Sequence, residues 1–331
     1  MEIHKPHAAR SWCEFFIEIG AIVTGILIAV ALSGPVYAAL SGFALSAPDK
    51  GIEIQTEDVT RFYKVYDAAG GHPTAEQLQH DYLDPGTEGL HHLMKARNVT
   101  GERIAQAIAT RPELYTEART CMAALPRVRE RLDVAFRTLV ALYPEARKPP
   151  VTIAVGRGRP LAISGPGDGV QIGLEAMCSP IARVLNPDVD DRFVHVIAHE
   201  YIHSQQDPKL DNDEHPTVLE RSLLEGAAEF VGEMISGDVA YGAFRASTKG
   251  QEKAIETRFA ADVDKTDLSD WLDNTTPDKL GDLGYWVGYR IVKSYYQHAP
   301  DKRRAVREII QMNDPHAFLA RSGWYPGLAL R

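Results

Sequence analysis

The 331-residue chain has few cysteines and no excess of basic residues, and both shortages narrow the range of possible functions. Three cysteines are too few for a disulfide-rich scaffold or for a zinc site built from four cysteines. Lysine and arginine number 36 against 45 aspartates and glutamates, which gives a net charge of -9. Because binding to a phosphate backbone needs a surplus of cations, nucleic acid is not expected as the main partner.

Internal repeats and low-complexity tracts are also absent from the sequence. A hydrophobic content of 44% and a charged content of 24% are typical of globular proteins and exclude a disordered or fibrous chain. The length suffices for one large domain or two ordinary ones. Histidine is plentiful by contrast, with 12 residues, so its spacing is informative.

The longest stretch without charged residues lies near the N-terminus, from Ile19 to Pro48. Its first part, Ile19–Leu32, is apolar enough to partition into a bilayer. Lys5 and Arg10 precede the stretch, which favours a cytoplasmic N-terminus. Residues 1–47 are therefore expected to be a signal peptide or an N-terminal membrane anchor.

These two interpretations remain open. Small residues in Val36-Tyr37-Ala38 suit cleavage by a signal peptidase, whereas a leader of about 18 residues before the apolar segment is long for a signal peptide. A buried helix of a cytosolic domain would need matching amphipathic partners, which the neighbouring sequence lacks. In both favoured cases the rest of the chain lies outside the cytoplasm, either periplasmic or anchored to the inner membrane. There Cys121 and Cys178 could form one disulfide.

Residues 48–148 are predicted to be a helical region, because apolar residues recur at three- and four-residue spacing. Thr110 is the expected cap of the helix that begins at Pro112. The helices expected there are Glu57–Ala69, Thr74–Tyr82, Gly101–Ala109, Pro112–Ala124 and Arg127–Leu142.

The pattern changes after residue 148, where Val151–Val155 and Val170–Met177 are predicted to be strands. The glycines between them do not fit a dinucleotide-binding or phosphate-binding fingerprint, so this loop is interpreted as a flexible connection. An acidic cluster from Asp188 suits a helix start, and helices are expected from there onward. The expected fold class is α+β, predominantly helical, with a small sheet before this helix. Residues 149–331 form the expected catalytic region, unless 48–331 is one continuous domain.

That helix contains the pattern H-E-x-x-H from His199 to His203. Two histidines four residues apart lie on one helical face, so their ring nitrogens can converge on one ion such as zinc. Glu200 lies about 100° round the helix and can take a proton from the water that the metal activates. The surrounding positions are apolar, which predicts burial, and buried imidazoles need binding partners. His195, one turn earlier, is interpreted as a core histidine.

A third ligand is expected from the next predicted helix, Val218–Ile235, which an acidic loop joins to the first as an antiparallel pair. Glu225 and Glu229 lie one turn apart on that helix, opposite its apolar arc, and a solvated face is the alternative for both. The small residues at 226–228 are expected to let the two helices approach closely.

H-E-x-x-H followed by E-G-x-A resembles the gluzincin metallopeptidases. This resemblance implies that His199, His203 and Glu225 bind Zn²⁺ and that Glu200 is the general base. In thermolysin-like members an aspartate four residues after the third ligand orients the first histidine, and Glu229 stands at that position here. The metzincin pattern is absent, because Gln206 stands where its glycine would fall.

The chain is also similar to a bacterial family of predicted zinc-dependent proteases, largely described as a domain of unknown function. The similarity covers most of residues 55–325, and it implies a zincin-like fold that hydrolyses peptide bonds. Gluzincins commonly stabilise the oxyanion with a tyrosine or histidine after the third ligand, for which Tyr285 and Tyr289 are the candidates. Aromatic core residues are the alternative for both tyrosines.

The main hypothesis is therefore a zinc metallopeptidase that acts on a peptide or protein outside the cytoplasm. The strand Val170–Met177 is expected to pair with an extended substrate. The alternative is a catalytically inactive, metal-stabilised zincin-fold binding protein of the cell envelope. A purely structural membrane protein would require the metal motif to be accidental.

Overall fold

The computed structural model describes residues 51–165, 169–276 and 280–330. Lys50–Arg331 form a compact unit of their own, with one hydrophobic core that extends from Ile52 to Phe318. The expected signal peptide or anchor, residues 1–47, lies outside the described residues. Among the described helices, none combines the length and the apolar character that a membrane span needs.

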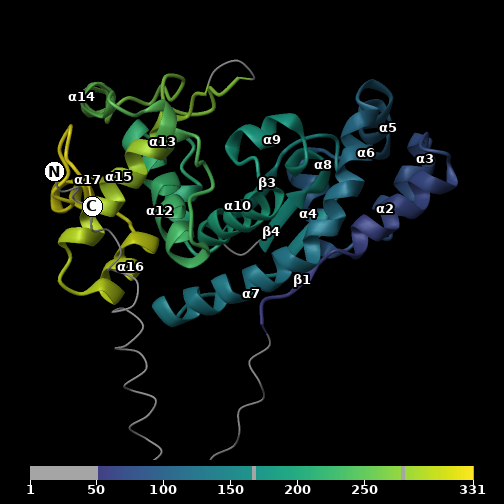
Figure 1. Ribbon diagram of the computed structural model, residues 1–331, viewed down its shortest axis with the longest axis horizontal. Helices are drawn as coiled ribbons and strands as arrows, with labels where there is room; N and C mark the ends of the chain where they lie inside the picture. The colour runs from purple at the N-terminus through teal and green to yellow at the C-terminus, as the bar shows by residue number, and fades with distance from the viewer. Residues whose placement is uncertain (1–50, 166–168, 277–279, 331) are drawn as a thin grey trace, which may run out of the picture. The chain divides into compact units, whose positions relative to one another are not determined.

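The described chain is predominantly helical with a small sheet, which confirms an α+β fold class (Figure 1). Up to residue 142 the helices are α2 (Glu57–Ala68), α3 (Ala75–Gln77), the π-helix η1 (Leu78–Leu83), α4 (Glu88–Arg97), α5 (Gly101–Thr110), α6 (Pro112–Cys121), the 3-10 helix η2 (Met122–Ala124) and α7 (Leu125–Leu142). The later helices are α8 (Leu174–Met177), α9 (Pro180–Leu185), α10 (Val189–His203), α11 (Pro208–Asp211), α12 (Val218–Ser236), α13 (Phe244–Ser247), α14 (Glu252–Asp262), α15 (Leu283–His298), α16 (Lys302–Ile310) and α17 (Pro315–Arg321).

The predicted helical region is largely confirmed, with two differences. The helix α4 was not predicted, and Thr87 begins it by accepting a hydrogen bond from the Leu90 amide. Thr110 does not cap α6, because its hydroxyl donates to the Gln106 carbonyl in the last turn of α5. The residue before α6 is Arg111, which makes no side-chain cap.

The sheet has the strand order β1-β2-β4-β3, formed by β1 (Ile54–Gln55), β2 (Val151–Ala154), β4 (Gly169–Gly173) and β3 (Ala162–Gly165). The strands β1, β2 and β4 are parallel, whereas β3 runs antiparallel to β4 with Ile163 opposite Gln171. Since β3 is the last strand of the order, one of its edges has no strand partner within the described residues.

Two expectations for this region were wrong. The loop between the predicted strands is not merely a flexible connection, because it contains β3. The predicted strand Val170–Met177 ends at Gly173, and the residues after it form α8. Its paired part, β4, lies between β2 and β3, so both of its edges are already used and it cannot pair with a substrate.

One disulfide links the helical region to the sheet region. Cys121 at the end of α6 is bonded to Cys178, which directly follows α8. The pairing that the sequence left open is therefore present in the structure.

The helix α10 lies between the sheet and α12 (Figure 1). It begins where Asp188 accepts a hydrogen bond from the Asp191 amide, as the acidic cluster predicts. The helix α12 begins with a capping box in which Thr217 and Glu220 satisfy each other's backbone amides. Both helices are buried over most of their length.

Backbone contact between α12 and α15 comes from glycines on both helices. A Cβ atom on Gly226 would lie 2.1 Å from the carbonyl carbon of Gly288, and one on Gly288 would lie 1.7 Å from the Ser222 carbonyl oxygen. Gly226 was expected to face α10, but it faces α15. The close approach of α12 to α10 occurs at Gly232, whose Cβ would lie 3.4 Å from the His199 Cα.

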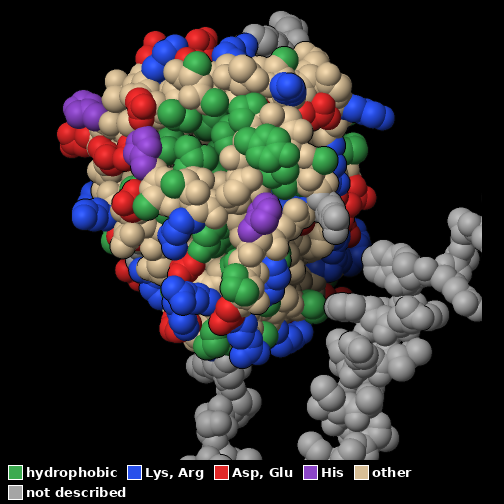
Figure 2. All heavy atoms as spheres, turned by 90° about the vertical axis from the view of Figure 1, so that its left-hand side faces the viewer, with side chains coloured by type: hydrophobic (Ala, Val, Ile, Leu, Met, Phe, Trp, Pro, Cys, Tyr) green, Lys and Arg blue, Asp and Glu red, His purple; other side chains and the backbone are tan. Residues whose placement is uncertain are grey.

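The outer surface mixes charges of both signs. On the face shown in Figure 2, Lys and Arg side chains lie among Asp and Glu side chains, with a group of hydrophobic side chains in the upper half.

We predict that Gly288→Ala destabilises the protein by about 2 kcal/mol or more, because the new methyl group would collide with backbone rather than with a movable side chain. Urea denaturation measures this change in unfolding free energy. Gly242→Ala is the matched control, since its Cβ would come no closer than 3.8 Å to the Leu185 carbonyl. An unchanged urea midpoint for Gly288→Ala would contradict the close contact of α12 and α15.

Candidate metal centre

Three buried side chains from α10 and α12 converge on one point. His199 Nε2 and His203 Nε2 lie 3.0 Å apart, and Glu225 Oε2 lies 3.0 Å from the second nitrogen and 3.4 Å from the first. The antiparallel packing of the two helices brings His203 opposite Glu225 and His199 opposite Glu229. In the described part of the chain, no other group of three such side chains comes together in this way.

The spacing of these three atoms fits a tetrahedral metal ion. Ligand atoms at about 2.0–2.1 Å from zinc are separated from one another by about 3.3–3.4 Å in a tetrahedron. The observed separations of 3.0, 3.0 and 3.4 Å are close to that value. Two imidazole nitrogens and one carboxylate oxygen are the donor set of a catalytic zinc site, which keeps its fourth position for water or substrate. The residues therefore fit Zn²⁺.

Both histidines have an oxygen partner on the ring nitrogen that faces away from this point. His199 Nδ1 lies 2.9 Å from Glu229 Oε1 as an ion-pair contact, and neither atom has a hydrogen bond of regular geometry. His203 Nδ1 lies 2.7 Å from Gln206 Oε1. An oxygen at Nδ1 keeps the proton there and leaves Nε2 free to bind a metal.

The protonation of the group follows from its burial and charges. Burial alone would lower the pKa of His199, but Glu225 and Glu229 outweigh it and raise this pKa to about 10. Burial would likewise raise the pKa of Glu225, but His203 and His199 hold it well below its usual range. At neutral pH Glu225 is thus a carboxylate, while the imidazoles must lose protons before a metal binds.

Glu200 lies on the side of α10 that faces β3. Its Oε2 accepts a hydrogen bond of 2.6 Å from the Ser164 hydroxyl, and its side chain is only partly buried. The hydroxyl bond fixes the carboxylate beside the end strand of the sheet. Glu200 is therefore next to the metal group but does not belong to it.

The two candidate tyrosines on α15 lie in different surroundings. The Tyr285 ring stacks on the His199 ring with centroids 6.0 Å apart, and Glu225 and Glu200 are among the charges that raise its pKa beyond the effect of burial. The Tyr289 hydroxyl instead donates to Glu233 at 2.7 Å and accepts a hydrogen bond from Lys293 at 2.8 Å. The structure thus brings Tyr285 to the site and gives the Tyr289 hydroxyl other partners.

His195 lies one turn before the metal group and outside it, as predicted. Its Nδ1 is 2.8 Å from the Ser236 hydroxyl, which in turn donates to the Gly232 carbonyl. It is a buried core histidine that contacts the C-terminal end of α12.

The sequence did not single out three residues that lie beside His199, Glu200 or His203: Ser164, Gln206 and Tyr241. The Tyr241 ring lies 5.9 Å from the His199 ring and 4.8 Å from the Tyr285 ring. Gln206 also donates to the Leu224 carbonyl, so it links the end of α10 to α12 beside Glu225. Its position three residues after His203, within one helical turn, was the available sequence signal.

Part of the chain that includes this group is similar to a known protein family. Residues 181–314 match the family model described as predicted Zn-dependent protease (DUF2268). This confirms the family resemblance, over a shorter segment than the 55–325 expected. The matched segment of this zinc-protease family includes the H-E-x-x-H helix, α12 and both tyrosines of α15. No curated protein and no solved structure matches the chain.

We predict that Gln206→Ala lowers the affinity for Zn²⁺ by about 10- to 100-fold, because His203 loses the acceptor that orients its ring. Competition with a chromophoric chelator measures this affinity. Gln251→Ala, an exposed change on a distant helix cap, is the control and should leave the affinity unaltered. Equal Zn²⁺ affinities of the two variants would show that Gln206 does not orient His203 for metal binding.

Zinc binding at pH 7 is expected to release protons, since His199 with a pKa of about 10 is protonated beforehand. The affinity should accordingly rise with pH from about 6 to about 9 and fall in acid. Calorimetric titrations in buffers of different ionisation enthalpy count the protons. Glu229→Gln removes one charge that raises this pKa, so fewer protons should be released. An affinity that stays constant down to about pH 4 would exclude the histidines as ligands.

Proposed function

We propose that this protein is a zinc-dependent metallopeptidase that hydrolyses peptide bonds outside the cytoplasm. The observation that supports it most directly is the convergence of two imidazole nitrogens and one carboxylate oxygen within 3.4 Å of one another, with the Glu200 carboxylate on the same helix. The family match, to a predicted zinc-dependent protease, supports the same chemistry.

In this proposal His199, His203 and Glu225 bind the zinc ion. Bound there, zinc supplies Lewis-acid polarisation of the peptide carbonyl and of the attacking water. Glu229 and Gln206 orient the two imidazoles through their Nδ1 atoms. These outer contacts keep the ring nitrogens directed at one point and so reduce the reorganisation needed during the reaction.

Glu200 acts as the general base and then as the general acid. Its carboxylate takes a proton from the attacking water and later delivers it to the leaving amine. Ser164 donates to one carboxylate oxygen, Oε2, so the hydroxyl orients the group that moves the proton. The chemistry requires this carboxylate to be near the metal but not bound to it, and the hydrogen bond to Ser164 supports this role.

The substrate would lie along β3, the end strand that contains Ser164. The unpaired edge of this strand can add an extended peptide through main-chain hydrogen bonds. The Tyr285 ring stacks on the His199 ring, and its hydroxyl is the proposed donor to the oxyanion of the tetrahedral intermediate. Tyr289 is the less suitable donor, because Glu233 and Lys293 already bind its hydroxyl.

Two observations support a location outside the cytoplasm. A disulfide joins Cys121 and Cys178, and such bonds persist mainly in oxidising compartments. The sequence also contains the charge-free stretch from Ile19 to Pro48, which suits a signal peptide or a membrane anchor.

The decisive experiment combines metal analysis of the purified full chain with cleavage of a peptide library. We expect about one zinc per chain, and Glu200→Gln should retain zinc but lose at least about 100-fold in cleavage rate, because a general base contributes that much. Glu214→Gln, an exposed acid in the loop before α12, is the control for the loss of one charge.

Two results would contradict the proposal. A chain without zinc would exclude the metal mechanism, and unchanged cleavage by Glu200→Gln would exclude the general base. Stoichiometric zinc with no cleavage of any peptide would favour a metal-stabilised binding protein instead.

A further inference from the structure

A cavity lies away from the metal centre, at the carboxyl ends of the parallel strands. It has a volume of about 650 Å³ and is lined by residues from α5, from the loop between β2 and β3, and from the segment around α8 and α9. Four of its lining residues are the arginines Arg103, Arg111, Arg157 and Arg159, and no acidic side chain lines it. We call this cavity the arginine pocket.

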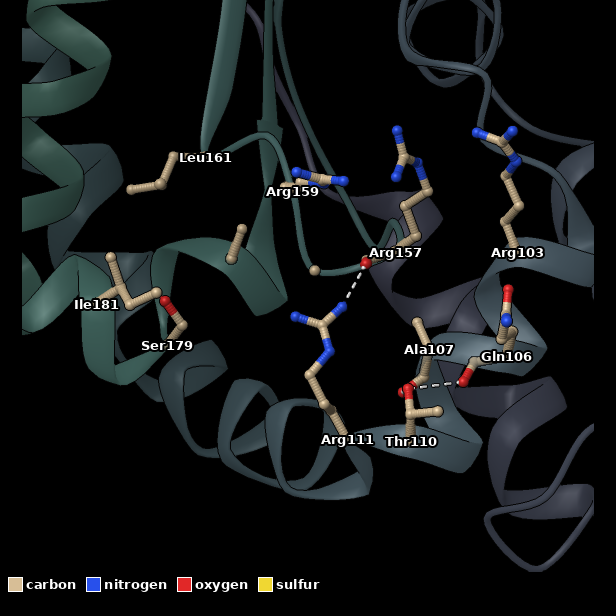
Figure 3. Close-up of a pocket in the computed structure, with 12 residues that line it drawn as sticks. Arg103, Gln106, Ala107, Thr110, Arg111, Arg157, Arg159, Leu161, Ser179 and Ile181 are labelled. Atoms are coloured by element: carbon tan, nitrogen blue, oxygen red, sulfur yellow. Dashed lines mark hydrogen bonds between the residues drawn. The ribbon is translucent and has the colours of Figure 1, made fainter. Parts of the chain in front are cut away.

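In the described residues no carboxylate lies within ion-pair distance of the four guanidinium groups, although the buried carboxylate of Glu175 attracts Arg111 over a longer distance. In the described part of the chain none of them forms an ion pair, and the hydrogen bonds they make go to backbone carbonyls. Arg111 donates to the Arg157 carbonyl at 2.9 Å (Figure 3). Burial lowers the pKa of Arg157, and the charges of Arg103 and Arg159 lower it further. A bound anion would relieve this repulsion.

The buried Glu175 fixes the loop that contains Arg157 and Arg159. The buried carboxylate of Glu175 accepts hydrogen bonds from the Gly156 amide at 2.9 Å and the Gly158 amide at 2.8 Å. Gly158 has a φ of +87°, and a Cβ there would lie 2.6 Å from the Arg111 guanidinium. Glycine at 158 therefore lets the loop approach Arg111, and Glu175 is occupied by the backbone.

The opposite wall of the pocket is apolar. Figure 3 shows Leu161 and Ile181 on one side of the cavity and the arginines at its centre and other side. Ile181 is 53% exposed, which is unusual for a large apolar side chain in this chain. The pocket thus suits a ligand that combines negative groups with an apolar group.

The pocket also lies next to the proposed peptide-binding strand. Leu161 directly precedes β3, and Ser164 of that strand donates to Glu200. At about 3.3 Å per residue, the Cα atoms of Leu161 and Ser164 are at most about 10 Å apart. A peptide extended along β3 with its scissile bond near Glu200 would reach the pocket three or more residues from that bond.

We propose that the arginine pocket binds an acidic stretch of the peptide substrate, with carboxylates on the arginines and an apolar side chain against Leu161 and Ile181. This assignment of a substrate class rests on the proposed peptidase function. The chain as a whole has a net charge of -9 and would repel acidic peptides, so the pocket supplies a local attraction.

A binding experiment on Glu200→Gln tests the pocket without any need for turnover. Two fluorescein-labelled peptides of about ten residues are compared, identical except that one has three consecutive glutamates and the other three glutamines. The glutamate peptide should bind at least about tenfold more tightly, and this advantage should shrink as salt rises from about 0.05 to 0.3 M. Fluorescence anisotropy measures both affinities.

Arginine variants then locate the binding. Arg103→Gln with Arg159→Gln should reduce the affinity for the glutamate peptide to that for the glutamine peptide. Arg137→Gln is the control for the loss of one charge and matches Arg103→Gln alone; because Arg137 is exposed and paired with Asp133 on α7, it should change nothing. If the double variant does not fold, Arg103→Gln alone should still cost at least about threefold, since its side chain bonds only to the Asn98 carbonyl.

Equal binding of the two peptides would overturn the proposal, as would equal losses in Arg137→Gln and the pocket variants. Arginine-dependent binding of inorganic phosphate or of phosphatidylglycerol vesicles, without preference between the peptides, would assign the pocket to a free anion or a membrane and also overturn it. If the protein cleaves no peptide but still prefers the glutamate peptide, and this preference depends on the arginines, the peptidase function is overturned and the ligand class is supported.

Discussion

The contact of α12 with α15 at Gly226 and Gly288 is the constraint on which the metal centre depends. Glu225 of the candidate metal group directly precedes one of these glycines, and Tyr285 lies one turn before the other. Side chains on either glycine would separate the two backbones. The position of Tyr285 over the His199 ring is therefore a result of helix packing, and Glu225 is fixed between two helices that each contact α12.

Charge balance explains why this part of the core tolerates so many ionisable groups. His199, His203, Glu225 and Glu229 are all nearly inaccessible to solvent, and each lies beside a group of opposite charge or a hydrogen-bond partner. A single unpaired charge at such depth would be costly, whereas alternating imidazoles and carboxylates compensate one another. The same reasoning distinguishes the arginine pocket, where four like charges line one cavity and the buried carboxylate of Glu175 behind it offsets the charge of Arg111.

The sequence was sufficient for those features that depend on local spacing. The spacing of His199 and His203 predicted α10, and the apolar face of α12 predicted the second helix. The same helical spacing placed Glu225 and Glu229 one turn apart, opposite that apolar face. Contacts between distant segments were not accessible: Ser164 belongs to a strand hidden in a glycine-rich loop, and its partner Glu200 is 36 residues away. Gly226 was expected to face α10 but faces α15, because a small residue permits close packing without indicating which helix approaches. Thr110 failed as a cap since its hydroxyl found a nearer acceptor in the preceding helix.

The disulfide joins two segments that line the arginine pocket. Cys121 ends the helix that follows Arg111, and Cys178 lies between Ala176 and Ser179 on the facing wall. The bond therefore fastens the two walls of the cavity to each other, while the metal-binding helices lie outside the linked segments. Breaking this bond would release the two walls of the pocket from each other, whereas His199, His203 and Glu225 lie on helices that the bond does not link.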